Sequence, residues 1–338
     1  MIDKAASLAE GVVLAACLQE RRLSKPEVLV AAKVWPRYMQ MLQAEFTAHE
    51  RLHDTDPAAF ALAAPRIRGV AASGEAKVTR ELIAKLPALE VISVFGVGYD
   101  GVDVAAAKER GIPVTHTPDV LTDEVADLAL ALMLSVARRV PQADRFVRAG
   151  QWPAGPFPLT RKVSGARLGI VGLGRIGLAI ARRGAALGMS IAYTSRTAKA
   201  GLPHRYFPSA QALAAEVDFL VAITPGGAGT RKLINAEVLR ALGPNGYFIN
   251  VARGSVADEA ALIEALQNGV IAGAGLDVYE NEPHVPAALL ALDNVVLTPH
   301  MASGTVQTRQ AMADLALANL TEHFAGRPVR TPVPEMST

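Results

Sequence analysis

The chain has 338 residues, 51% of them hydrophobic, and its 34 basic and 32 acidic side chains leave a formal charge of +2. This length exceeds one ordinary hydrophobic core and predicts two domains of roughly 100 to 200 residues each. The near-neutral charge, without a basic block, excludes nucleic acid as an expected partner, and no apolar run reaches the ~20 residues of a membrane span. The single cysteine, Cys17, excludes a multi-cysteine zinc site, so we expect no metal and a reducing, cytoplasmic location.

The first third of the chain alternates between strand and helix patterns. Residues 1–25 match no regular element, and we interpret them as a loosely attached extension or a short helix. Apolar runs typical of buried parallel strands follow at residues 27–32, 67–72, 89–95 and 112–116. Helices are predicted over residues 37–49, 79–85 and 102–110, and a longer one over residues 124–140 leads onward.

A glycine-rich turn then separates an apolar strand from a helix. Gly172, Gly174 and Gly177 form a Gly-x-Gly-x-x-Gly turn between the strand at residues 168–171 and the helix at residues 176–187. The first glycine allows a tight turn, the second lets backbone N–H groups approach a pyrophosphate, and the third lets the helix pack on the strand. Because both flanks are present, the turn predicts a dinucleotide site rather than a plain strand-turn-helix.

The strand at residues 190–194 indicates which dinucleotide binds. An NAD site carries an Asp or Glu about 20 residues past the glycines, but this chain has Ser195, Arg196 and Thr197 there. A hydroxyl and a guanidinium suit the 2′-phosphate of NADP. We therefore predict NADP(H) over NAD(H); the alternative is a solvated basic loop.

Four more apolar strands complete the pattern, at residues 218–223, 246–251, 273–278 and 294–298. A final helix over residues 305–324 is expected to pack back on the first domain. The fold class is therefore α/β, with two doubly wound parallel-sheet domains. We expect a discontinuous, flavodoxin-like substrate-binding domain over residues 1–122 and 302–338 and a Rossmann dinucleotide-binding domain over residues 123–301, with a cleft where they meet.

Polar residues follow three strands of the second domain. Arg253, Glu282 and His300 come just after the strands at residues 246–251, 273–278 and 294–298. Carboxyl ends of parallel strands border the ligand crevice, so all three could face the cofactor. Arg253 suits a substrate carboxylate, and His300 suits a proton donor whose charged form a neighbouring Glu282 would favour. Each residue alone has a structural explanation, but their joint placement after a dinucleotide turn favours catalysis.

The other histidines lack such companions. His116 ends a strand and is a weaker candidate. The remaining ones are expected at the surface: His49, His53, His204, His284 and His323.

At these segments the chain resembles the D-isomer-specific 2-hydroxyacid dehydrogenases, especially the glyoxylate/hydroxypyruvate and hydroxyphenylpyruvate reductases. The similarity extends from Pro26 to Phe324 and is most specific at residues 96–103, 250–254, 275–278 and 298–300, besides the glycine turn. It implies that Arg253, Glu282 and His300 are catalytic. The implied substrate-binding residues are Ser73, Gly74, Val97, Gly98, Trp152, Arg253 and His300. The implied cofactor-binding residues are Thr122, Gly172, Gly174, Arg175, Ile176, Gly177, Ser195, Arg196, Thr197, Thr224, Pro225, Val251, Ala252, Asp277, His300 and Ser303.

The resemblance also implies a homodimer, with the helix at residues 124–140 and an arm containing Trp152 reaching across to the partner. The implied reaction is NADPH-dependent reduction of glyoxylate or hydroxypyruvate to the D-2-hydroxy acid. The alternatives are a larger 2-oxo acid, such as hydroxyphenylpyruvate or 2-ketogluconate, and a non-catalytic, nucleotide-sensing corepressor. The chain departs from the family pattern at Thr224–Gly227 and at Ala302, where glycine is usual.

Overall fold

A computed structural model describes residues 25–74 and 76–336, so most of the predicted N-terminal extension lies outside the described residues. The chain divides into two compact units, which are described separately. The first combines the residues up to Pro118 with those from Gln310 onward, and the second spans Asp119–Arg309. These boundaries differ by a few residues from the predicted ones, and the second boundary falls within the first turn of the last helix, α14 (Val306–Phe324).

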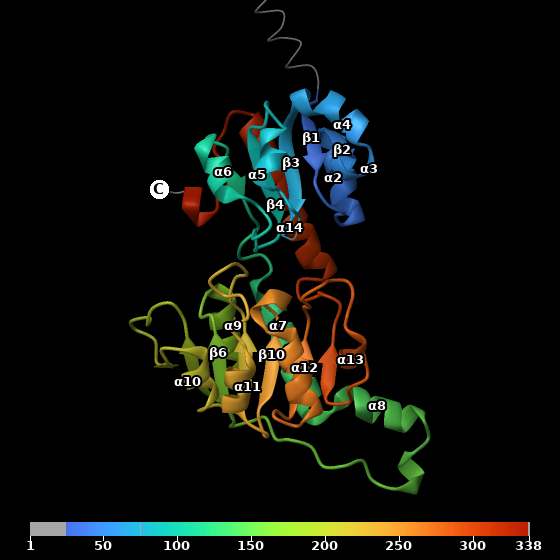
Figure 1. Ribbon diagram of the computed structural model, residues 1–338, viewed down its shortest axis with the longest axis vertical. Helices are drawn as coiled ribbons and strands as arrows, with labels where there is room; N and C mark the ends of the chain where they lie inside the picture. The colour runs from blue at the N-terminus through green and yellow to red at the C-terminus, as the bar shows by residue number, and fades with distance from the viewer. Residues whose placement is uncertain (1–24, 75, 337–338) are drawn as a thin grey trace, which may run out of the picture. The chain divides into compact units, whose positions relative to one another are not determined.

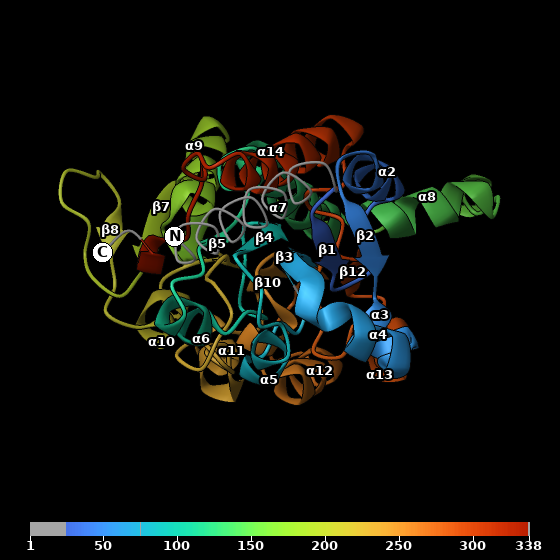
Figure 2. The ribbon, with the colours of Figure 1, turned by 90° about the horizontal axis from the view of Figure 1, so that it is seen from above.

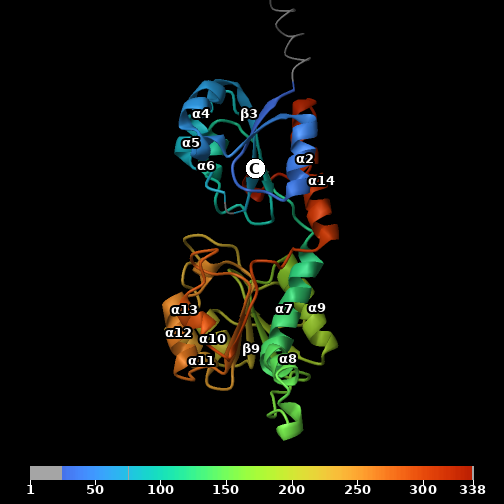
Figure 3. The same cartoon turned by 90° about the vertical axis from the view of Figure 1, so that its right-hand side faces the viewer.

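The first unit is a five-stranded parallel sheet in the order β2-β1-β3-β4-β5. Its strands are β1 (Glu27–Val30), β2 (Thr47–Glu50), β3 (Ile67–Ser73), β4 (Val91–Phe95) and β5 (Val114–Thr115). One face is covered by α2 (Pro36–Glu45) and α14, and the other by α4 (Pro57–Ala63), α5 (Arg80–Ala84) and α6 (Val104–Glu109) (Figure 3). Short helices α3 (Leu52–Thr55) and η1 (Ala64–Arg66) flank α4. This order confirms the flavodoxin-like prediction.

The prediction of one helix over residues 37–49 is wrong at its end. The helix stops at Glu45, Phe46 is extended and buried, and the next four residues form β2. β2 pairs in parallel with β1 at the sheet edge, with Glu27 opposite Thr47. Pairing with a distant strand overrides the local helical pattern here.

The second unit is a seven-stranded parallel sheet in the order β12-β11-β10-β9-β6-β7-β8. Its strands are β6 (Arg167–Val171), β7 (Ser190–Thr194), β8 (Arg205–Tyr206), β9 (Phe219–Ala222), β10 (Tyr247–Asn250), β11 (Gly273–Leu276) and β12 (Val295–Leu297). One face carries α7 (Thr122–Arg138) and α9 (Arg175–Ala186); the other carries α10 (Ala210–Ala214), α11 (Ala236–Leu242), α12 (Glu259–Gln267) and α13 (Ala287–Leu290) (Figure 3). The order reverses between β6 and β9, as in a Rossmann fold, which confirms that prediction.

Small residues let α7 lie close to the sheet. A Cβ atom added at Gly275 of β11 would lie 2.9 Å from Cβ of Leu132, and one at Gly273 would lie 3.0 Å from Val136. The Gly-Ala-Gly-Leu sequence of β11 is therefore needed for helix packing, since larger side chains would push α7 outward.

The helix predicted over residues 124–140 begins and ends two residues earlier than expected, and a second helix follows it. α7 ends at Arg138, because Arg139 adopts a left-handed conformation with φ of 50°. Pro141, which cannot continue a helix, lies in the first turn of α8 (Val140–Arg148). α8 extends away from the seven-stranded sheet (Figures 1 and 2; see Figure 2 for its full length). Within the described residues, no helix is long and apolar enough to cross a membrane.

Candidate active site

The glycine turn lies at the switch point of the second unit, between the carboxyl end of β6 and the first turn of α9. Gly172 has φ of 104°, and an added Cβ atom would lie 2.8 Å from the carbonyl oxygen of Ile223. A Cβ atom at Gly177 would lie 2.2 Å from the carbonyl oxygen of Gly172. Gly174, in contrast, faces open space within 4 Å, and no side chain caps α9 there. The backbone N–H groups and dipole of this helix N-terminus therefore fit a pyrophosphate.

The loop after β7 contains Ser195 and Arg196, which the sequence predicted to bind a 2′-phosphate. Ser195 Oγ donates to the carbonyl oxygen of Thr197 at 2.7 Å, which shapes the loop. Arg196 is exposed and makes no ion pair among the residues that the structure describes. This guanidinium is thus available to an anionic ligand.

Arg253 follows β10 in a segment held by local hydrogen bonds. Asn250 is buried; its Oδ1 accepts from Ala252 N at 3.1 Å and its Nδ2 donates to the Arg253 carbonyl at 3.1 Å. Arg253 Nη1 donates to the Ala252 carbonyl at 2.8 Å. A Cβ atom at Gly254 would lie 1.9 Å from the carbonyl of Tyr279, so only glycine lets this segment approach the one after β11.

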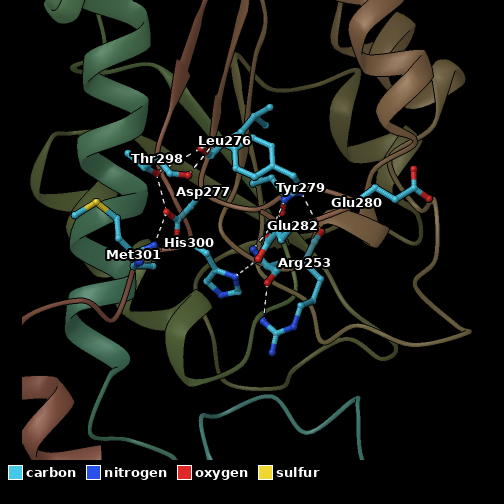
Figure 4. Close-up of polar contacts among 12 residues, drawn as sticks. Arg253, Leu276, Asp277, Tyr279, Glu280, Glu282, Thr298, His300 and Met301 are labelled. Atoms are coloured by element: carbon cyan, nitrogen blue, oxygen red, sulfur yellow. Dashed lines mark hydrogen bonds and ion pairs between the residues drawn. The ribbon is translucent and has the colours of Figure 1, made fainter. Parts of the chain in front are cut away.

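Glu282 and His300 form a hydrogen-bonded pair. His300 Nδ1 lies 2.7 Å from Glu282 Oε2, and because a carboxylate can only accept, the imidazole donates. The other carboxylate oxygen of Glu282 accepts from Tyr279 N at 2.9 Å. The His300 side chain is 35% exposed, and it points to the same side of the strand ends as Arg253 (Figure 4). Three strand ends thus bring together the three residues predicted to be catalytic.

Asp277 holds the loop that carries His300. Its buried carboxylate accepts from Thr298 Oγ1 at 2.7 Å, Met301 N at 2.8 Å and Ala302 N at 2.9 Å (Figure 4). His300 itself has φ of 49°, a left-handed conformation that side-chain-bearing residues adopt at a cost. These three hydrogen bonds offset that cost and fix the direction of the imidazole.

Tyr279 has a structural function that sequence reasoning missed. Burial raises the pKa of its phenol to about 12, so the hydroxyl stays protonated and donates to the carbonyls of Thr298, at 3.0 Å, and Leu276. Its backbone N–H orients Glu282. An aromatic residue three positions before a predicted catalytic glutamate was the available signal.

The remaining predicted cofactor residues all belong to the second unit. Thr122 begins α7, and Arg175 begins α9 and pairs with Asp119 at 2.9 Å. Others follow β9 and β10 or the His300 loop: Thr224, Pro225, Val251, Ala252 and Ser303. Trp152, in the 3₁₀ helix η2 (Trp152–Ala154), is 67% exposed.

The remaining predicted substrate residues belong to the first unit. Ser73 ends β3 with Gly74 next to it, and Val97 and Gly98 follow β4. His49, His53 and His323, which were expected at the surface, are only partly exposed, with side chains 19%, 14% and 24% accessible. His49 pairs with Glu27 at 2.8 Å.

The chain is similar in sequence and fold to known proteins. The family model described as D-isomer specific 2-hydroxyacid dehydrogenase, NAD binding domain, matches residues 130–302. Hydroxyphenylpyruvate reductase of Plectranthus scutellarioides is 51% identical over 274 residues, covering 81% of this chain and 88% of that protein. Glyoxylate/hydroxypyruvate reductase A of Arabidopsis thaliana is 50% identical over 267 residues, covering 79% and 85%. The crystal structure of NADPH-dependent glyoxylate/hydroxypyruvate reductase of Sinorhizobium meliloti, in complex with NADP and malonate, has a TM-score of 0.87 and 50% identity, covering 93% of this chain and 98% of that one.

A Rossmann unit with a glycine turn and an Arg, Glu and His at the same sheet edge defines a nicotinamide-dependent dehydrogenase. The chain belongs to the D-isomer-specific 2-hydroxyacid dehydrogenase family. It is an oxidoreductase with a dinucleotide-binding domain, which confirms the family and enzyme class expected from the sequence.

Two alanine substitutions separate the structural and binding functions of the glycine turn. Gly174→Ala should keep the unfolding temperature and weaken dinucleotide binding about tenfold or more, because its methyl group enters the space left for phosphate. Gly177→Ala should destabilise the fold by roughly 1–3 kcal/mol through its clash with Gly172. Thermal unfolding and fluorescence titration with NADPH measure both. Normal NADPH affinity in Gly174→Ala would show that the phosphates bind elsewhere.

Proposed function

We propose that the protein reduces glyoxylate or hydroxypyruvate to the D-2-hydroxy acid with NADPH. The hydrogen bond between Glu282 and His300, at the sheet edge that also carries the glycine turn and Arg253, is the observation that supports this most strongly. Relatives about half identical in sequence are named for these two substrates.

The roles follow from the chemistry of each side chain. Bound NADPH supplies the hydride. Arg253 pairs with the substrate carboxylate and polarises the adjacent carbonyl. His300 protonates the developing alkoxide from Nε2, since Nδ1 is committed to Glu282. Glu282 orients the ring and favours its charged form. In the first unit, the backbone N–H groups of Val97 and Gly98 bind the substrate carboxylate.

The charge pattern supports NADPH as the preferred cofactor. No Asp or Glu occurs anywhere between Asp144 and Glu216, a segment that includes β7 and the loop after it. An NAD site needs a carboxylate near the end of this strand for the ribose hydroxyls. In this proposal Ser195 and the exposed Arg196 take that place and meet the 2′-phosphate of NADPH.

Arg196→Ala should weaken NADPH binding by about tenfold or more and change NADH binding less than about twofold, because only NADPH carries the phosphate. Dissociation constants for both cofactors, from fluorescence titration, measure this. Lys162→Ala, another exposed cation in the acid-free segment, is the matched control. Equal weakening of both cofactors by Arg196→Ala would remove the basis for the NADPH preference.

The activity test is NADPH and NADH oxidation, followed by absorbance, with glyoxylate, hydroxypyruvate, hydroxyphenylpyruvate and 2-ketogluconate. The proposal requires turnover with one of the first two. A preference for hydroxyphenylpyruvate would favour the second candidate, which the Plectranthus relative supports. Tight NADPH binding without any turnover would contradict a reductase.

We also propose a homodimer in the cytoplasm. Four large apolar side chains on α8 and the segment after it are exposed, namely Val140 at 52%, Val147 at 54%, Trp152 at 67% and Leu159 at 101%. Large exposed apolar side chains are typical of subunit interfaces. The single cysteine suits a reducing compartment. Light scattering of the purified protein tests the dimer.

A further inference from the structure

Hydrogen bonds to its carbonyl groups hold the loop after β4 in place. The Gly96 carbonyl accepts from Thr117 N at 2.8 Å, and the Val97 carbonyl lies 2.9 Å from His116 Nδ1. A carbonyl can only accept, so the His116 ring donates. Because the peptide unit is planar and trans, holding the Val97 carbonyl toward His116 directs the N–H of Gly98 to the opposite side.

The His116 ring is itself held in place. The residue is only 8% exposed, and its ring meets Tyr99 edge-on, with centroids 5.4 Å apart and an interplanar angle of 89°. Its backbone pairs with Thr331: His116 N donates to the Thr331 carbonyl at 3.1 Å, and Thr331 Oγ1 donates to the His116 carbonyl at 2.6 Å.

Thr331 belongs to the C-terminal tail, residues 330–336, which adds an antiparallel pairing beside β5. Val333 N donates to the Val114 carbonyl at 2.9 Å. The buried Asn319 of α14 accepts from Thr331 N at 3.1 Å and donates to Thr331 Oγ1 at 2.9 Å. Tyr99, in the loop after β4, donates to Glu335 at 3.0 Å. The tail therefore contacts both His116 and the loop.

We infer that His116, supported by the C-terminal tail, is a positioning residue that presents the Gly98 N–H to the carboxylate of the substrate. The inference rests on the proposed function, in which this loop binds the carboxylate. A hydrogen bond to the carbonyl of the same peptide unit also strengthens its N–H as a donor. His116 touches no reacting atom, so its loss should impair substrate binding rather than chemistry or cofactor binding.

The test compares His116→Phe, which keeps a ring but has no donor, with His116→Asn, whose amide nitrogen occupies about the place of Nδ1. His116→Phe should raise KM for glyoxylate about fivefold to tenfold at unchanged kcat and NADPH affinity, and His116→Asn should restore KM. The control is His323→Phe, a partly buried histidine of the same unit that contacts Glu90 and not this loop. Malonate, as a dicarboxylate probe, is titrated into each enzyme–NADPH complex, so that binding is read without turnover.

An unchanged KM and malonate affinity in His116→Phe would overturn the inference, as would equal damage by His116→Asn. If His116→Phe does not fold, Thr331→Val replaces it, since it removes the hydroxyl donor to His116 and leaves the imidazole. Its KM should then rise about threefold at unchanged kcat, and no change would overturn the inference. A wild-type protein that binds malonate but does not turn over would contradict the proposed function alone.

Discussion

His300→Ala should lower kcat for 2-oxo acid reduction about 10²–10⁴-fold, the range for loss of a general acid. NADPH affinity should stay within about twofold of wild type, because the glycine turn and the loop after β7 are untouched. Stopped-flow absorbance with saturating NADPH measures the hydride-transfer rate directly. The effect is expected to be the largest of any substitution in this chain, since the hydrogen bond from Glu282 orients this one ring as the proton donor.

Two control variants distinguish loss of the imidazole from an effect on the backbone conformation of residue 300. His300 has positive φ, which asparagine tolerates better than most residues, so His300→Asn removes the imidazole with little added strain. Exposed His284, two residues after Glu282 in sequence, should tolerate alanine without loss of activity. Turnover near the wild-type rate in His300→Asn would refute the assignment of the proton donor.

Arg253→Gln should lower kcat/KM for glyoxylate about 10²–10³-fold, because the substrate loses a charged, two-pronged donor to its carboxylate and carbonyl. Arg253→Lys should recover only part of this, since an ammonium keeps the charge but not the fork geometry. Initial rates over a range of glyoxylate concentrations measure it, with NADPH affinity as a second readout.

The matched control is Arg231, an exposed arginine that pairs with Glu280 at 3.6 Å. Arg231→Gln should change kcat/KM by less than about twofold, as is usual for a surface ion pair. Full recovery in Arg253→Lys would mean that charge alone acts, and an unchanged kcat/KM in Arg253→Gln would exclude Arg253 from the substrate site.

The elements of the fold that could be predicted are those with a local signal. The turn at Gly172–Gly177 and the buried strands β4, β6 and β9 are readable because glycine spacing and continuous apolar runs each have a physical cause within a few residues. Strand β2 and the break at Arg139 could not be read this way. β2 exists through its pairing with β1, and the pattern of α7 alone does not show where the chain turns left-handed.

The residues of the candidate site also differ in whether a local sequence signal predicts them. The identities of Arg253, Glu282 and His300 could be proposed from strand ends, and so could the dinucleotide turn. The functions of Asp277 and Tyr279 could not, because they consist of hydrogen bonds to backbone groups about 20 residues away. Nor could the contact of Gly254 with Tyr279, which depends on how closely two loops approach.

Residue types and their order along the chain were therefore enough for the α/β class, the dinucleotide turn, the family and the candidate catalytic residues, because each rests on chemistry within a short segment. The 2.7 Å Glu282–His300 pair, the burial of Asp277 and the link from the C-terminal tail through His116 to Val97 depend on the folded chain. These contacts join segments up to some two hundred residues apart, such as His116 and Thr331. Their distances follow from the packing of whole strands and helices, which no local pattern specifies.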